Sequence, residues 1–232
     1  MINVNSNSHS QTAISLKRNK GNLINKHLNF DIQLASMGSE HRNEIEAFIK
    51  QGFAKTYDAK ISISTPYLLA LSNGSFKAAL GIRTGRDDLF LEQYLSGPIE
   101  QQAIFIDNKI ERQEIVEFSH LFSNAKRFTI PLFMVTAVSL FCRNHKYLVF
   151  SGTEKVIKLL DNAGVPTTFI GNADHTKIST STDDWGNYYS TNPKIMAVSL
   201  LEVMSVISEH PLYTRMFQSL DSQIAKICRQ LR

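Results

Sequence analysis

The stretch from Glu114 to Phe141 changes its hydrophobic period part of the way along. Residues 115–122 alternate with a period of two, which is typical of a strand. The apolar block from Ile130 to Cys142 has lost that period and is long enough for a helix. Between them lies the polar and basic segment SNAKRFT. We therefore predict a strand, a loop and a helix in succession, a unit that belongs in an α/β fold.

The apolar block is too short to cross a membrane. It has thirteen residues, with Arg127 before it and Arg143 after it, whereas a spanning helix needs about 20. We interpret it as a buried core helix, so that any membrane contact would be made at the surface. The first residues of the chain are rich in Asn and Ser and lack the apolar region of a secretory signal, which predicts a cytoplasmic protein without a signal peptide.

The composition excludes several classes of site. The net charge of +4 comes from Lys and Arg residues that are scattered along the chain, so a nucleic-acid groove is not indicated. The seven histidines are dispersed, and Cys142 and Cys228 lack close ligand partners, so we predict no metal site. Both cysteines lie in helical patterns, which favours free, buried thiols over a disulfide.

The order of elements predicts one folded unit behind a tail. Residues 1–29 have the composition of a flexible tail, and residues 30–232 fit a single domain that ends in an amphipathic helical segment. The Asn73-Gly74 pair between two apolar runs predicts a β-hairpin. Crossover helices alternate with strands further along. The predicted fold class is α/β, with a mixed central sheet that includes the hairpin and carries helices on both faces.

The basic loop from Ser123 to Thr129 has two interpretations. A helix that begins after it would present free N–H groups and a positive dipole end, and Lys126 and Arg127 would add charge that favours a phosphate. The alternative is a solvated connector before a core helix. The loop has no glycine to let backbone approach a phosphate closely, and from these residues alone the connector is the favoured interpretation.

The strand itself contains Glu117, a carboxylate among apolar residues, which is costly to bury unless it is paired or used. Glu117 could act as a general base, or it could be a structural carboxylate held by Arg83 or Arg112; both interpretations stay open. Ser119 and His120 are neighbours on the strand, so we expect them to point to opposite faces and not to pair as nucleophile and base. We interpret His120 as a half-buried structural histidine.

The segment DWGNYY gathers Trp185, Tyr188 and Tyr189. These aromatic residues could form the wall of a pocket, with a tyrosine hydroxyl as proton donor or substrate anchor. They could equally form a plug that closes the core. The plug is our interpretation for Trp185, and both alternatives stay open for the two tyrosines.

Several blocks together resemble a known family. In chain order they are PYLLAL, NG, AALGIR, LFLEQYL, PIEQ, IVEFSHL, LVFSGTEKVIKLLDNAGVP and DWGNYYSTNPKI. Their order and spacing are similar to those of the thermostable hemolysin family, the delta-VPH type of marine bacteria, from about Phe30 to about Glu202. The pattern is also similar to that of GNAT-type N-acyltransferases and, more distantly, of acyl-homoserine-lactone synthases.

The resemblance implies roles for particular residues. In a GNAT-like domain the strand from Glu114 to Phe122 would be the splayed strand that receives pantetheine, and the following loop would hold the pyrophosphate. Glu117 would be the catalytic base and Tyr188 a proton donor. The implied donor-binding residues are Phe118, His120, Phe122, Ser123, Asn124, Ala125, Lys126, Arg127, Phe128 and Thr129.

The loop departs from the usual acyltransferase pattern, because SNAKRF lacks the Gln/Arg-x-x-Gly-x-Gly/Ala arrangement. That leaves a longer acyl donor, as acyl-CoA or on acyl carrier protein, or a loss of catalysis. Two hypotheses follow. The chain is an acyltransferase that acts on a small amine or amino acid, or it is a non-enzymatic hemolysin that damages membranes directly.

Overall fold

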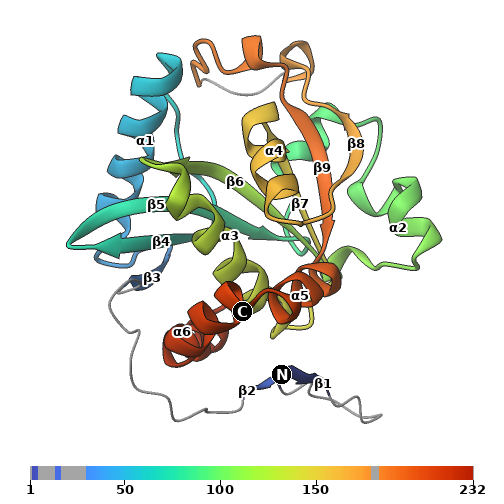
Figure 1. Cartoon of the computed structure of the whole chain (residues 1–232). Helices are drawn as coiled ribbons and strands as arrows, with labels where there is room; N and C mark the ends of the chain where they lie inside the picture. Colours follow the sequence, from blue (N-terminus) through green and yellow to red (C-terminus); the bar gives the residue numbers. More distant parts are fainter. Residues whose placement is uncertain (1, 5–13, 17–29, 179–182, 232) are drawn as a thin grey trace.

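The computed structural model describes residues 2–4, 14–16, 30–178 and 183–231. Most of the predicted tail, residues 1–29, lies outside the described residues. Two short strands within it, β1 (Ile2–Val4) and β2 (Ile14–Leu16), pair with each other antiparallel. They form a ribbon that is separate from the main sheet (Figure 1).

The main sheet has seven strands and is mixed. In chain order its strands are β3 (Asp31–Ser36), β4 (Tyr67–Asn73), β5 (Ser75–Thr84), β6 (Ile115–Ser123), β7 (Tyr147–Gly152), β8 (Thr168–Asn172) and β9 (Lys194–Ser199). In space the order is β3-β4-β5-β6-β7-β9-β8. Strands β6 and β7 run parallel to each other, and the other neighbours in this sheet are antiparallel.

The predicted hairpin is confirmed. Strands β4 and β5 pair antiparallel, with Asn73 opposite Ser75. Gly74 makes the turn at a φ of 68°, a region that glycine enters without the steric cost of a side chain. Because β5 also pairs with β6, the hairpin places β6 at the centre of the sheet.

Helices cover both faces of this sheet (Figure 1). They are α1 (Arg42–Tyr57), α2 (Ala103–Asp107), α3 (Lys126–Phe141), α4 (Glu154–Asn162), α5 (Leu200–Glu209) and α6 (Pro211–Gln230). Short 3₁₀ helices are η1 (Phe90–Tyr94), η2 (Ile99–Gln101), η3 (Arg112–Glu114), η4 (His175–Lys177) and η5 (Tyr189–Thr191). Apolar residues of α3, α5 and α6 share one core with one face of the sheet, and α1 packs on the other face. The predicted mixed α/β architecture is confirmed.

The apolar block forms a buried helix, but α3 begins at Lys126, four residues before the predicted start at Ile130. Lys126 and Arg127 are exposed and complete the first turn, because polar side chains there can stay in water. Further along, residues such as Met134 and Val135 are fully buried. A helix that is apolar all round belongs in a core, and no helix in the described part of the chain is long and apolar enough to cross a membrane.

We expect Val135→Asp to destabilise the whole protein, because Val135 is 0% exposed and the substitution buries a carboxyl group without a partner. The expected loss of unfolding free energy is about 4 kcal/mol or more, measured by urea denaturation. Leu201→Asp on α5 is the matched control, because Leu201 is 61% exposed. A Val135→Asp protein as stable as this control would show that α3 is not a core helix.

Candidate functional site

Strands β6 and β7 pair along only part of their lengths. Their parallel register ends where Phe118 lies opposite Phe150. Beyond this pair, β6 continues along β5 to Ser123, and β7 continues along β9 to Gly152. The two strands therefore separate at the centre of the sheet, and no strand of the described residues pairs with the facing edge of β6 there.

A bulge in β6 lies where the strands separate. His120 and Leu121 on β6 together face the single residue Leu80 on β5, because Ala79 pairs with Phe122 and Gly81 with Ser119. His120 has a φ of 53°, in the left-handed region. A residue other than glycine costs about 1–3 kcal/mol in such a conformation, and residues strained in this way are common at functional sites. A bulge bends its strand and increases the local twist, so it directs β6 away from β7.

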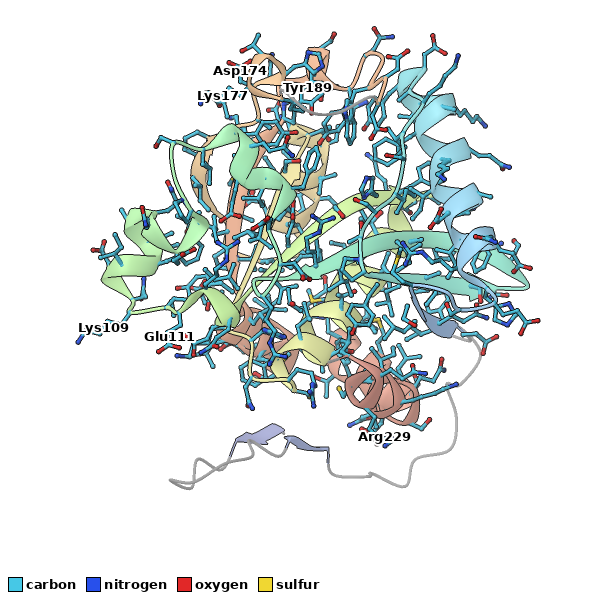
Figure 2. The ribbon with its side chains drawn as sticks, turned by 180° about the vertical axis from the view of Figure 1, so that it is seen from behind. Lys109, Glu111, Asp174, Lys177, Tyr189 and Arg229 are labelled. Atoms are coloured by element: carbon cyan, nitrogen blue, oxygen red, sulfur yellow. The ribbon has the colours of Figure 1, made fainter. Side chains whose placement is uncertain are left out.

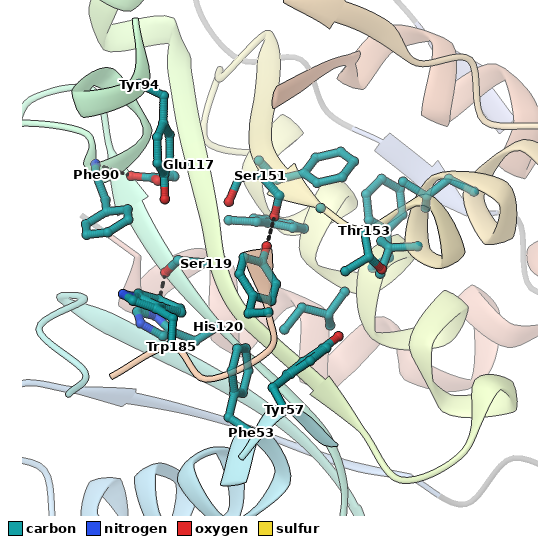
Figure 3. Close-up of a pocket in the computed structure, with 18 residues that line it drawn as sticks. Phe53, Tyr57, Phe90, Tyr94, Glu117, Ser119, His120, Ser151, Thr153 and Trp185 are labelled. Carbon is teal, nitrogen blue, oxygen red and sulfur yellow. Dashed lines mark hydrogen bonds between the residues drawn. The ribbon is translucent and has the colours of Figure 1, made fainter. Parts of the chain in front are cut away.

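A pocket occupies the space between the separated strands (Figure 3). Its walls come from both faces of the sheet: Phe53 and Tyr57 of α1 on one face, and Phe133 of α3 with Val156 of α4 on the other. Most of the lining is apolar, and its polar members are Tyr57, Tyr94, Glu117, Ser119, His120, Ser151, Thr153 and Tyr188. The pocket thus connects the two faces of the sheet past a small set of polar groups.

Glu117 is the buried carboxylate of this pocket, with 2% of its surface exposed. Its two oxygens accept hydrogen bonds from the backbone N–H groups of Phe90 (2.7 Å) and Leu91 (3.0 Å), at the start of η1. Burial raises the pKa of Glu117 to about 7, against the lowering effect of these hydrogen bonds and of the charge of Arg83. A carboxyl group with this pKa can both accept and release a proton near neutral pH.

The two arginines considered as partners of Glu117 are engaged elsewhere. Arg83 donates to the carbonyl oxygen of Asp88 (2.8 Å) and to the hydroxyl of Ser64 (3.1 Å), and only its field reaches Glu117. Arg112 forms salt bridges with Glu92 of η1 and Glu100 of η2. Peptide N–H groups hold the carboxylate instead, and a search of the sequence for basic partners cannot reveal them.

The expectation that Ser119 and His120 point apart is wrong, because the bulge interrupts the alternation of the strand. Nδ1 of His120 lies 3.0 Å from Oγ of Ser119 and 3.3 Å from Oγ1 of Thr65, and the two hydroxyl oxygens are 3.1 Å apart. Gly81 leaves room for this hydroxyl pair, because a Cβ there would lie 2.7 Å from both oxygens. Burial lowers the pKa of His120 to about 4, so its imidazole is neutral at pH 7.

Trp185 and Tyr188 are buried and also line the pocket. The ring of Trp185 stacks on that of His120, with 6.2 Å between centroids and 18° between planes. The hydroxyl of Tyr188 donates to the carbonyl oxygen of Ser151, near the end of β7, over 3.3 Å. Burial raises the pKa of Tyr188, which keeps its hydroxyl protonated and able to donate. The aromatic segment therefore serves both as part of the core and as a pocket wall.

Tyr189 lies at the outer end of this aromatic group. Its hydroxyl oxygen is 2.6 Å from that of Tyr94, and the ammonium of Lys177 donates to the carbonyl oxygen of Tyr94 over 2.8 Å. Figure 2 shows Tyr189 at the same end of the molecule as Asp174 and Lys177. Tyr189 thus joins η1 to the segment after β8 and supports the pocket wall from outside.

The structure brings four of the predicted site residues together at the pocket: Glu117, Phe118, His120 and Tyr188. The remaining predicted donor-binding residues do not line the pocket: they lie at the end of β6, in the turn after it and in the first turn of α3. Phe122 packs against Phe48, with 5.1 Å between ring centroids.

The loop residues take three kinds of position. Ser123 ends β6, and Asn124 and Ala125 form the turn; the Ser123 hydroxyl donates to the carbonyl oxygen of Ala125 (2.7 Å) and the Asn124 amide to that of Phe76 (3.3 Å). Lys126 and Arg127 are exposed at the start of α3. Phe128 and Thr129 are buried, and the ring of Phe128 meets that of Phe30 edge-on in the core.

Sequence reasoning missed Tyr57, Tyr94 and Thr65 as site residues. For Tyr57 a signal existed, because it continues the buried α1 stripe of Ile49 and Phe53 at intervals of four residues. A tyrosine at the end of an apolar stripe often places its hydroxyl where the core meets solvent. Tyr94 lies in the LFLEQYL motif, but that motif gave it no role, and both Tyr94 and Thr65 reach the site through tertiary contacts.

Several solved structures are similar to this chain. TofI in an apo form is 8% identical, with 80% of this chain and 99% of that chain covered and a TM-score of 0.57. The AHL synthase LasI is 12% identical, with 74% of this chain and 90% of that chain covered and a TM-score of 0.51. The CoA-dependent acyl-homoserine lactone synthase BjaI with SAM and isopentyl-CoA is 9% identical, with 77% of this chain and 88% of that chain covered and a TM-score of 0.50. At such low identities the likeness shows the fold alone, and it confirms the predicted GNAT-like fold. No curated protein matches the sequence.

A family comparison covers most of the chain. The sequence profile of the thermostable hemolysin family matches residues 35–204, from β3 into α5, and so includes β6, β7 and the pocket between them. The resemblance seen in the sequence motifs is thereby confirmed, and the chain belongs to the thermostable hemolysin family.

Proposed function

We propose that this protein is a GNAT-type acyltransferase that moves an acyl group, in the cytoplasm, from acyl-CoA or acyl carrier protein to a small amine or amino acid. The observation that carries the proposal is the separation of β6 from β7, which opens a largely apolar pocket with Glu117 and Tyr188 on its wall. The acyl-homoserine lactone synthases that share the fold include BjaI, described as CoA-dependent.

The separated strands suit a pantetheine thioester. Beyond Phe118 no strand in the described part of the chain pairs with the edge of β6 that faces β7, so peptide groups on this edge could bond the amides of pantetheine. The apolar lining from Phe133, Val156 and Leu160 would surround the acyl chain. Phosphates of the donor would then lie toward the turn after β6 and the start of α3, where helix N–H groups, Lys126 and Arg127 favour anions.

The proposed reaction is a direct transfer. The acceptor nitrogen forms a bond to the thioester carbonyl carbon, the carbon–sulfur bond breaks, and the thiol leaves. Glu117 takes a proton from the acceptor nitrogen, directly or through water, and Tyr188 donates a proton to the departing thiolate. The Tyr188 hydroxyl lies near the end of β7, beside the opening where the sulfur would sit.

The direct test uses purified protein with acyl-CoA thioesters of short, medium and long chains and a mixture of amines and amino acids. We expect release of free CoA thiol to depend on the acceptor, and mass spectrometry to detect the N-acyl product. Acyl carrier protein loaded with the same chains is the second donor. If neither donor supports acceptor-dependent thiol release, the proposed activity is wrong.

We expect Glu117→Gln to slow acyl transfer by about 10²–10⁴-fold, the usual contribution of a general base. In the wild type kcat/KM should rise with pH up to about 7, the pKa of Glu117, because the base acts only when ionised. The mutant should lack that inflection. A pH profile of kcat/KM that keeps its inflection near 7 in the mutant would assign the proton to another group.

The same substitution also has a structural effect. The carboxylate accepts from two backbone N–H groups, and glutamine turns its own NH₂ group toward one of these donors. An unsatisfied buried donor costs about 1–3 kcal/mol, so rates must be compared at a temperature where both proteins are folded. Circular dichroism melting curves supply that control.

Replacing Lys126 and Arg127 together by Ala should weaken acyl-CoA binding by more than about tenfold, because each charge-assisted contact contributes roughly 1.5–3 kcal/mol. Both side chains are exposed, so the fold should be unaffected. The control is Lys226→Ala with Arg229→Ala on α6, which removes the same charge from exposed positions. If the two double mutants give equal titration curves for acyl-CoA, Lys126 and Arg127 do not bind the phosphates of the donor.

Hemolysis distinguishes an acyltransferase from a directly lytic protein. We expect purified protein without an acyl donor not to lyse washed erythrocytes, whereas lipid extracts of cells that make the wild type should lyse them. Extracts of cells that make Glu117→Gln should be inactive, because the lytic agent would be the acylated product. Equal lysis by purified wild type and mutant would instead identify the protein itself as the lytic agent.

A further inference from the structure

A second cavity of about 220 Å³ adjoins the first on the α1 side of the sheet. The two cavities share Phe90, Ser119, His120 and Trp185, which form the wall between them. The second is lined mainly by polar groups, among them Arg83 and Asp183. A polar cavity in contact with an apolar one through a bulged strand suits two substrates of different chemistry that must meet.

Arg83 has unused binding capacity in this cavity. Its guanidinium carries five N–H donors and contacts neutral oxygens: the carbonyl of Asp88 (2.8 Å), the hydroxyl of Ser64 (3.1 Å) and, weakly, the carbonyl of Ser64 (3.4 Å). Within the described residues no carboxylate lies within 4.0 Å of it. A guanidinium bound only to neutral groups can still form a bidentate pair with a carboxylate.

Two further groups complement a small zwitterion. Asp183 brings a negative charge to the same cavity, where its carboxylate accepts a hydrogen bond from the backbone N–H of Ser62 (2.9 Å). Trp185 is 8% exposed, and its indole N–H is buried without an acceptor among the described residues. A buried donor without a partner is uncommon, and an oxygen of a ligand in this cavity would satisfy it.

We infer that this second cavity is the acceptor site, that Arg83 binds a carboxylate of the acceptor, and that the acceptor is therefore a free amino acid and not a simple amine. The inference rests on the proposed acyl transfer and names its second substrate. The amino group of the amino acid, which must be unprotonated when it attacks, would lie toward Asp183 and the shared wall, and its carboxylate toward Arg83.

The strand register places the two ends of such an acceptor appropriately. Arg83 pairs with Glu117, and Gly81 pairs with Ser119, so the carboxylate anchor and the shared wall are two residues apart along β5. Two residues of a strand span roughly 7 Å, which an extended arginine side chain and an amino acid can bridge. The small Gly81 also keeps the Ser119 and Thr65 hydroxyls together at that wall.

The test compares each amino acid with the amine obtained by removing its carboxylate, for example phenylalanine with phenylethylamine, at saturating acyl donor. We expect the wild type to prefer the amino acid in kcat/KM by about tenfold to a hundredfold, the range for a charge-assisted hydrogen-bonded pair. In Arg83→Met the KM for the amino acid should rise by a similar factor and the preference should disappear, with KM for the donor unchanged. Arg83→Lys should restore only part of the preference, because an ammonium cannot bind a carboxylate in the same forked geometry.

Arg86→Met is the matched control, since Arg86 is exposed beyond the end of β5 and does not line the cavity. It should behave as the wild type does. If the wild type acylates amines and amino acids equally well, or if Arg83→Met keeps the preference, the acceptor inference is wrong while acyl transfer stands.

A binding measurement separates this outcome from failure of the proposed function. N-dodecanoyl-phenylalanine and N-dodecanoyl-phenylethylamine are titrated into wild type, Arg83→Met and Arg86→Met by calorimetry. We expect the carboxylate-bearing ligand to bind wild type and Arg86→Met about tenfold to a hundredfold more tightly than Arg83→Met. The same affinity for both ligands in all three proteins would overturn the inference even if no transfer were detected.

Discussion

The bulge at His120 is the feature on which the candidate site depends. In this bulge two residues of β6, His120 and Leu121, lie opposite one residue of β5, Leu80. His120 takes a left-handed backbone conformation there, which costs free energy. The pairing of β6 with β7 ends at Phe118, just before the bulge, and beyond it the centre of the sheet opens. The same distortion brings His120 to Ser119 and Thr65, so the opening between the strands and the polar wall beside it arise together.

Glu117 connects the opening between β6 and β7 to η1, a segment distant from β6 in the sequence. Its carboxylate binds the first two N–H groups of η1, so a residue at the centre of β6 positions Phe90 and, further along η1, Tyr94. Both aromatic residues line the first pocket. A group that holds a pocket wall and also has a pKa near 7 combines a structural contribution with the proposed catalytic one. For that reason, stability and rate must be measured separately in its variants.

The two cavities differ in chemistry. The first is largely apolar and passes between the strands, whereas the second is polar and contains opposite charges in Arg83 and Asp183. Such a division suits a donor with a long apolar chain and a small zwitterionic acceptor that meet at Ser119 and His120. A lipid-like product would follow from joining the two, which would connect the proposed activity with the hemolytic activity implied by the family name.

Local patterns in the sequence were sufficient to predict the hairpin at Asn73-Gly74, the buried helix α3 and the strand β6, because turn chemistry and hydrophobic period act over a few residues. The combination of motifs was sufficient for the family. Tertiary structure decided the rest. Alternation along β6 predicted that Ser119 and His120 point apart, but register with β5 produced the bulge that brings them together. Basic residues were considered as partners for Glu117, but backbone N–H groups far along the chain became its partners. Hydrogen bonds between strands and loops that are distant in sequence depend on the tertiary fold, and the local hydrophobic period of a segment contains no information about them.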